Sequence, residues 1–400
     1  MISSSWTWET RFLFRVALMV FTVTVAIGIF NGFHFIELSR AVLLTHVHAG
    51  TLGFITLSAF GAAFWLYAGP GGTMDGHARG VAVAMAVAVP LYVLAFLTGN
   101  FVLRAVFGTP VLLLIIGMVV FLIRNIGTGR STPRLGVLLG FTVLVIGSTI
   151  GVLIQIQLAA DHTFLPDNAV AGHAAAQVFG YLVLVALSLI DWRLKGTSTL
   201  TWAGGIQVVF YFLAGILVAM GALLNIQPLL GSFIPLSIIA TVIFLVRVGG
   251  SVVTTNFMEA GSRRHYAIAV PWVIVNIVVT IIAIVIVISK GIDNAPFNLF
   301  IAADHAIFIG VMVNMVFGLI QDFTPGQRHI APWTENVVFW VLNIALVGFV
   351  TTLLLNQPTG EKFFVPFQGA AILVGIVVFS MRLAAPPAAS DEPAKVIAAA

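Results

Sequence analysis

The sequence predicts an all-α, polytopic membrane protein with twelve transmembrane helices. The composition is the first reason, because 60% of the 400 residues are hydrophobic and only 8% are charged, whereas about a quarter of a soluble domain is charged. The second reason is a recurring apolar run of the length that a helix needs to cross a bilayer, about 20 residues. The third is the distribution of lysine and arginine, which alternates between successive loops.

The apolar runs fall near residues 11–31, 45–68, 80–99, 101–123, 135–157, 169–190, 203–225, 232–248, 266–288, 299–320, 334–355 and 364–383. Helices are expected because lipid cannot satisfy an open backbone. Only Gly99 and Asn100 separate the third run from the fourth. The first run has no small-residue cleavage site after it and is predicted to be a span. Residues 1–383 are predicted to form one membrane domain, and the Pro/Ala-rich tail 384–400 to be disordered.

The charge distribution predicts the orientation of the chain. With a cytoplasmic N-terminus, fourteen of the 18 lysines and arginines fall in segments that face the cytoplasm. Only Arg40, Arg104, Lys290 and Lys362 fall outside. This asymmetry predicts that both termini are cytoplasmic. We therefore expect a multi-pass protein of a bacterial-type cytoplasmic membrane.

Four histidines lie at the outer ends of three predicted helices. His46 and His48 belong to helix 2, His173 to helix 6 and His305 to helix 10. These helices are four apart in the chain, which predicts a pseudo-threefold arrangement of four-helix units. The other histidines, His34, His77, His162, His265 and His329, are interpreted as solvated loop or helix-end residues.

An imidazole within a membrane span is costly and indicates function. A proton relay needs carboxylate partners, and the spans offer few beyond Asp304 and Glu37. A metal or haem needs only imidazoles that converge from different helices. Hydrogen-bonded packing is the alternative for any single histidine, but the pattern of the three helices favours shared ligation in one pocket. Because residues two apart on a helix point about 200° apart, His46 and His48 either serve two sites or one of them is a spectator.

At these residues the sequence resembles the catalytic subunit of the haem-copper oxidase superfamily. The shared features are twelve helices and histidines at the outer ends of helices 2, 6 and 10, and Gly172-His173 is similar to the start of the oxidase copper motif. The small NnrS-type haem proteins match more closely in motif. Their His-x-His with a following Gly-Phe is similar to His46-Val47-His48 with Gly53-Phe54, and their His-Ala-x-x-x-Gly resembles the segment that begins at His305.

The resemblance implies an integral membrane haem protein. It implies haem b held by His305 and either His46 or His48, with copper near His173 left open, and with Arg40 and Arg104 as candidate partners of the haem propionates. Nitric oxide or oxygen is the implied small ligand, and an oxidoreductase activity stays open. We expect lipid around the protein and no nucleic-acid partner.

The sequence also departs from the oxidase pattern. Helix 7 has no histidine pair, so a standard three-histidine copper site cannot be built, and the absence of cysteine excludes covalently attached haem. The rival interpretation is a secondary transporter of the major facilitator type, which also has twelve helices. Transporters of that type divide into two six-helix halves, and the segment between the predicted helices 6 and 7 is short here.

Overall fold

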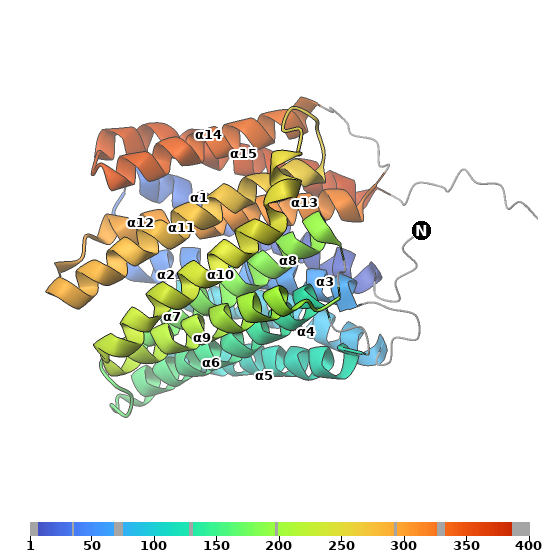
Figure 1. The fold of residues 1–400 in the computed structure, drawn as a ribbon. Coiled ribbons are helices and arrows are strands. Elements are labelled where there is room, and N and C mark those ends of the chain that lie inside the picture. The colour runs from blue at the N-terminus through green and yellow to red at the C-terminus, as the bar shows by residue number, and fades with distance from the viewer. Residues whose placement is uncertain are drawn as a thin grey trace, which may run out of the picture.

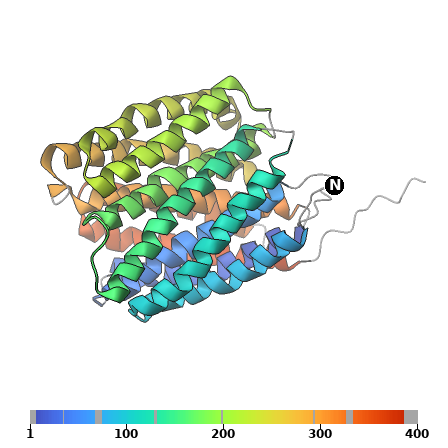
Figure 2. The ribbon, with the colours of Figure 1, turned by 90° about the horizontal axis from the view of Figure 1, so that it is seen from below.

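The structure, a computed structural model, is a bundle of long helices that run nearly parallel to one another (Figures 1 and 2). It describes residues 7–33, 36–67, 75–127, 131–196, 199–291, 294–325 and 333–385. Within these residues, 12 helical stretches are long and apolar enough to cross a membrane. The predicted all-α class and the predicted number of spans are therefore confirmed. From residue 386 onward, the tail predicted to be disordered lies outside the described residues, as do His34 and His329.

Nine spans are single helices. They are α1 (Thr7–Phe33), α4 (Asp75–Leu97), α5 (Phe101–Asn125), α6 (Thr132–Ala160), α9 (Trp202–Leu224), α10 (Gln227–Val253), α11 (Ser262–Lys290), α14 (Trp333–Leu354) and α15 (Pro358–Ala384). The predicted break at Gly99 and Asn100 is confirmed, because α4 ends at Leu97 and α5 begins at Phe101. Gly99 takes a φ of 72°, which favours glycine, and the Asn100 side chain caps α5 by accepting from the Leu103 N–H.

The second, sixth and tenth spans are each divided by a π-helical segment. The second consists of α2 (Arg40–His48), η1 (Ala49–Thr56) and α3 (Leu57–Tyr67); the sixth of α7 (Ala169–Ala175), η2 (Ala176–Leu182) and α8 (Val183–Lys195); the tenth of α12 (Phe297–His305), η4 (Ala306–Val313) and α13 (Asn314–Phe323). The half-helices α2, α7 and α12 lie at one end of the bundle (Figure 1), which we call the histidine end. Extended π-helical segments are rare and often mark functional sites.

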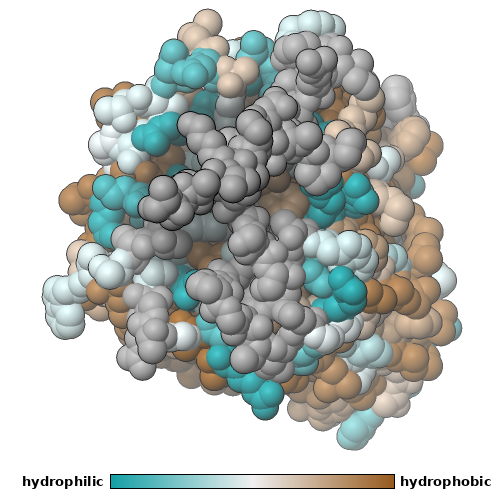
Figure 3. Space-filling view, turned by 90° about the vertical axis from the view of Figure 1, so that its right-hand side faces the viewer, coloured by the Kyte–Doolittle hydropathy of each residue, from teal (hydrophilic) through white to brown (hydrophobic). Residues whose placement is uncertain are grey.

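These three divided spans form the interior of the bundle. In their most apolar stretches, 83%, 72% and 61% of the residues are buried, against 33–50% in the other nine. A large part of the surface of the undivided helices is therefore exposed on the outside of the bundle. Polar residues gather on the end face opposite the histidine end, and apolar residues spread over the flank beside it (Figure 3). That distribution suits helices that cross a bilayer and end in water.

Buried ion pairs fix the helices to one another near this opposite end. Arg247 of α10 bonds to Asp191 of α8 at 2.7 Å, and the Asp191 side chain is fully buried. The second Arg247 nitrogen donates to the Gln207 amide oxygen of α9 at 2.6 Å. Arg382 of α15 pairs with Glu335 of α14 at 2.6 Å. Each pair joins two helices at a position that is shielded from water. Loss of either partner would therefore leave a buried charge without compensation.

The interpretation of His265 as a solvated loop residue is wrong. α11 begins at Ser262, four residues earlier than the apolar run suggests, so His265 lies inside a helix and has no exposed surface. Its Nδ1 donates to the Asn314 amide oxygen at 3.1 Å. Asn314 in turn donates to Asn343, which accepts from the Trp272 indole as well. The neighbouring Arg264 is also buried, so the two charged residues before His265 do not mark a loop.

The Asp191–Arg247 pair gives the first prediction. Arg247→Met should lower the free energy of unfolding by about 3–5 kcal/mol, because it leaves the Asp191 carboxylate buried without its cation. Adding Asp191→Leu should recover most of this loss. Thermal unfolding in detergent measures both effects. Lys195→Met, which removes an exposed cation from the same helix as Asp191, should cost less than about 1 kcal/mol. A double variant as unstable as the single one would contradict the prediction.

Candidate functional site

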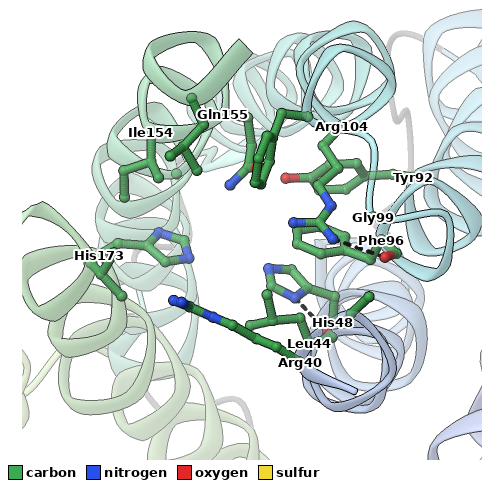
Figure 4. A pocket seen from close by; sticks show the side chains of 15 residues that line it. Arg40, Leu44, His48, Tyr92, Phe96, Gly99, Arg104, Ile154, Gln155 and His173 are labelled. Carbon is green, nitrogen blue, oxygen red and sulfur yellow. Dashed lines mark hydrogen bonds between the residues drawn. The ribbon is translucent and has the colours of Figure 1, made fainter. Parts of the chain in front are cut away.

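Two cavities lie at the histidine end, and each is lined by two of the predicted histidines. The first, which we call cavity 1, has a volume of about 340 Å³ and lies between His48 of α2 and His173 of α7. The two rings point into it from different sides, and Arg40 and Arg104 reach it as well (Figure 4). Helices α4, α5 and α6 supply the remaining walls, mainly through Tyr92, Phe96, Phe101, Arg104, Gly151, Ile154, Gln155 and Leu158.

The second, cavity 2, is lined by His46 of α2 and His305 of α12 and has a volume of about 490 Å³. Its walls come from α1, η1, η4, α14 and α15. Apolar side chains make up most of them, including Phe21, Phe54, Phe308, Phe349, Ile29 and Ile372. Its polar lining consists mainly of Asp304, Glu361, Asn31, Asn298 and Gln368, in addition to the two imidazoles.

All four imidazoles are held by the same kind of hydrogen bond. The Nδ1 atoms of His46 and His173 donate to carbonyl oxygens of the preceding span, Thr24 at 2.8 Å and Gly147 at 2.7 Å. The Nδ1 atoms of His48 and His305 donate to the carbonyl oxygens four residues earlier in their own helices, Leu44 and Ile301, both at 2.8 Å.

These hydrogen bonds determine what the rings can do. A carbonyl oxygen only accepts, so each Nδ1 must carry a proton. In a neutral imidazole the other nitrogen, Nε2, then keeps its lone pair. This is the arrangement found at metal-ligating histidines, where a hydrogen bond at one nitrogen fixes the tautomer and orients the other. In their neutral form the four rings therefore keep a lone pair on Nε2, two of them at each cavity.

Glycine makes room for two of the rings. A Cβ built on Gly151 of α6 would lie 2.7 Å from Cε1 of His173, and one built on Gly28 of α1 would lie 3.0 Å from Cε1 of His46. Real side chains do not tolerate such contacts without movement. Both positions stand four residues after the residue whose carbonyl binds the same imidazole, so one face of the preceding helix both anchors the ring and accommodates it.

Aromatic and cationic groups complete cavity 1. The His48 ring stacks on Phe96 with 3.7 Å between centroids. Arg104 is buried; it donates to the Phe96 carbonyl oxygen at 2.9 Å and lies over the Phe96 ring. Its Nε and the Gln155 side-chain oxygen have no hydrogen-bond partner within the described part of the chain. Polar groups thus remain available along a wall that is otherwise apolar.

The structure divides the predicted ligands differently from the sequence interpretation. The imidazoles of spans 2, 6 and 10 line two cavities, not one shared pocket, and His46 and His48 each serve their own. His305 shares its cavity with His46. Arg40 and Arg104, predicted to accompany the His305 site, instead lie in the other cavity with His48 and His173. In the described residues, no group of three or more His, Cys, Asp or Glu side chains could hold a metal ion by itself.

A repeat that was not predicted from the sequence surrounds these histidines. Each π-helical segment begins with Ala-x-x-x-Gly: Ala49 to Gly53, Ala176 to Gly180 and Ala306 to Gly310. A Cβ on each of these glycines would collide with the first helix of its own four-helix unit, at Val20, Val143 and Trp272 respectively. The same close approach therefore occurs three times, and its signal was present in the sequence as one spacing used three times.

The repeat assigns each histidine to one of two positions. Counted from the Ala of the repeat, His46 and His173 stand three residues before it, in what we call the first position. His48 and His305 stand one residue before it, in the second position. First-position rings bond to the preceding span and second-position rings to their own helix. Each cavity combines one ring of each kind, contributed by two different four-helix units.

A third junction of the same kind, between the second and third units, has alanine at both positions. Ala175 occupies the second position of span 6 and Ala303 the first position of span 10, and both are buried. The Ala303 carbonyl accepts from the Asn276 side chain of α11 at 2.9 Å, just as the His46 carbonyl accepts from the Thr24 hydroxyl of α1 at 3.4 Å. The equivalent backbone contact persists where the imidazoles are absent.

Comparison with protein-family models and with curated protein sequences finds no match. The resemblance to haem-copper oxidases and NnrS-type proteins therefore stays a prediction from the motifs.

The cradle around His173 gives the second prediction. Gly151→Ala should lower the melting temperature of the protein in detergent, because the new methyl group displaces the imidazole and overpacking of this kind costs about 1–3 kcal/mol. Gly249→Ala in α10 is the matched control, since a Cβ there meets nothing within 4 Å. Its melting temperature should stay equal or rise slightly, because alanine favours a helix over glycine. Equal destabilisation by both substitutions would contradict the prediction.

Proposed function

We propose that the protein is an integral membrane haem protein that transfers electrons, with iron porphyrin held between His48 and His173 in cavity 1 and between His46 and His305 in cavity 2. The observation that carries the proposal is the pairing of four anchored imidazoles, two at each cavity, from different spans. Interhelical packing alone does not require every histidine to direct the same nitrogen into a cavity.

The residues present fit the group in three respects. Each cavity offers two imidazole Nε2 donors, which are groups that would hold haem iron. The volumes of about 340 and 490 Å³ lie in the range of cofactor pockets. Cavity 1 also offers Arg40 and Arg104 at its rim and wall, and guanidinium groups suit the two carboxylates of a porphyrin.

Two imidazole ligands support electron transfer over catalysis. A bound haem supplies a one-electron couple whose potential depends on its ligands and surroundings. The chain's own contribution would be to hold two oriented imidazoles at each cavity, where they would be available as ligands of the iron. Binding of nitric oxide or oxygen, and an oxidoreductase activity, remain predictions that rest on the resemblance. Copper near His173 also remains a prediction that rests on the resemblance.

The transporter alternative gains no support from the arrangement of the helices. Facilitator-type transporters consist of two six-helix halves that rock about a central site. Here the π-helical segments, the Ala-x-x-x-Gly spacing and the histidine hydrogen bonds all recur at intervals of four spans. Those regularities support three four-helix units around the buried second, sixth and tenth spans, and the two candidate sites lie at junctions between these units.

An optical and metal analysis of the purified protein gives the third prediction. The unsubstituted protein should show a Soret band, sharp absorption bands on reduction, and two haems per chain by pyridine haemochrome. His173→Ala should lower the haem content to one by removing an axial ligand of cavity 1, and His305→Ala should do the same at cavity 2. The double variant should bind none.

His162→Ala is the control, because His162 is exposed and lines neither cavity. Its haem content should equal that of the unsubstituted protein. A colourless protein without iron would overturn the proposal. Equal haem loss from the control and from the cavity variants would show that the imidazoles do not act as ligands.

A further inference from the structure

The two cavities are lined by ionisable groups of opposite kind. Arg40 and Arg104 line cavity 1, and no carboxylate does. Asp304 and Glu361 line cavity 2, and no lysine or arginine does. The difference cannot be read from the resemblance, because the sequence analysis expected both arginines at the site of His305.

Neither set of charges is balanced by an ion pair within the described residues. The Asp304 and Glu361 carboxylates take part in no described salt bridge, whereas the carboxylates of Asp191, Asp322, Glu9 and Glu335 all do. Arg104 donates its described hydrogen bond to a backbone carbonyl oxygen, and its guanidinium lies over two aromatic rings. The charges at both cavities can therefore act on whatever is bound there.

Such charges shift the reduction potential of an iron centre in a predictable direction. Reduction of ferric to ferrous iron adds one electron and lowers the positive charge of the site by one. A nearby cation favours that change and a nearby anion opposes it, and the interaction is strong where water is excluded. In cavity 1 the arginines should also offset the negative charge of the porphyrin carboxylates. In cavity 2 the carboxylates of the protein increase the negative charge instead.

We infer that Arg40 and Arg104 raise the potential of the iron in cavity 1, that Asp304 and Glu361 lower the potential of the iron in cavity 2, and that electrons pass from cavity 2 to cavity 1. This inference rests on the proposed function. A group held by His46 and His305 would be the donor of one electron, and a group held by His48 and His173 would be its acceptor, with no proton transferred. Span 2 connects the two sites, since it supplies one ligand to each and a single residue, Val47, separates them.

Redox titration of singly loaded variants tests the inference. His305→Ala leaves only the cavity 1 haem and His173→Ala leaves only the cavity 2 haem, so each midpoint potential can be followed optically without overlap. The equilibrium constant for electron transfer from cavity 2 to cavity 1 should be at least tenfold in favour of cavity 1. This corresponds to a midpoint potential at cavity 1 that is higher by about 59 mV or more for a one-electron couple.

The charges are then removed one at a time. In the His173→Ala background, Asp304→Asn and Glu361→Gln should each raise the midpoint potential. In the His305→Ala background, Arg104→Gln and Arg40→Gln should each lower it; Arg40 is exposed, so its substitution tests the effect even if loss of the buried Arg104 disturbs folding. Asp167→Asn, which removes an exposed carboxylate from neither cavity, is the control and should shift neither potential.

Three outcomes are distinguishable. Potentials in the expected order that move in the expected directions support the inference. Haem present at both sites, with equal or reversed potentials or with potentials that ignore the four charge substitutions, overturns the inference and leaves the proposed function intact. An unsubstituted protein with no Soret band overturns the proposed function, and the inference with it.

Discussion

The hydrogen bond from each imidazole Nδ1 to a backbone carbonyl is the constraint on which the rest of the site depends. Within the bundle an unpaired imidazole N–H would lose its hydrogen bond to water, which is unfavourable in free energy. Each ring therefore needs an acceptor. Two rings take the carbonyl of a neighbouring span, at Thr24 and Gly147, which requires the two backbones to approach closely. Small residues on the facing helix allow that approach. The other two rings use the preceding turn of their own helix and need no neighbour. One chemical requirement, solved in two ways, therefore directs all four Nε2 atoms.

The π-helical segments explain how one span can serve both a cavity and a tightly packed interior. A π turn has one more residue than an α turn, so it rotates everything that follows relative to what precedes it. In span 2 the half before the segment presents His46 and His48 to opposite cavities. The half after it, α3, is buried on every side. A continuous α-helix would keep the same angular spacing of side chains along its whole length. It could not change which residues face the cavities and which face the interior. The glycine within each segment then brings the span against the first helix of its unit.

Much of the fold follows from the sequence, because hydrophobic length and the Gly99-Asn100 break are local signals. The site follows only in part. The angle between His46 and His48 left two interpretations, and choosing between them requires the position of Thr24 on a different span. Arg104 lies beside His48 and not beside His305, because its guanidinium packs on the Phe96 ring of the neighbouring helix α4. His265 was misplaced because Arg263 and Arg264 precede it. Arg264 is nevertheless buried, held by the Glu335 carbonyl and the Asn336 side chain more than 70 residues away.

Within the described residues, the third junction lacks the imidazoles that the other two junctions supply. Thr280 follows Asn276 by four residues, as Gly28 follows Thr24 and Gly151 follows Gly147. A side chain at Gly28 or Gly151 would press against the imidazole that the same helix anchors. Threonine at the equivalent place is therefore compatible with Ala303 and incompatible with a histidine there. The missing ring and the added side chain compensate each other in volume, as close packing of a protein interior demands. At the junction between the second and third units, threonine thus stands where the other two junctions have glycine, and alanine stands where they have histidine, which is what we expect if the three units share one plan and only the other two junctions bind a ligand.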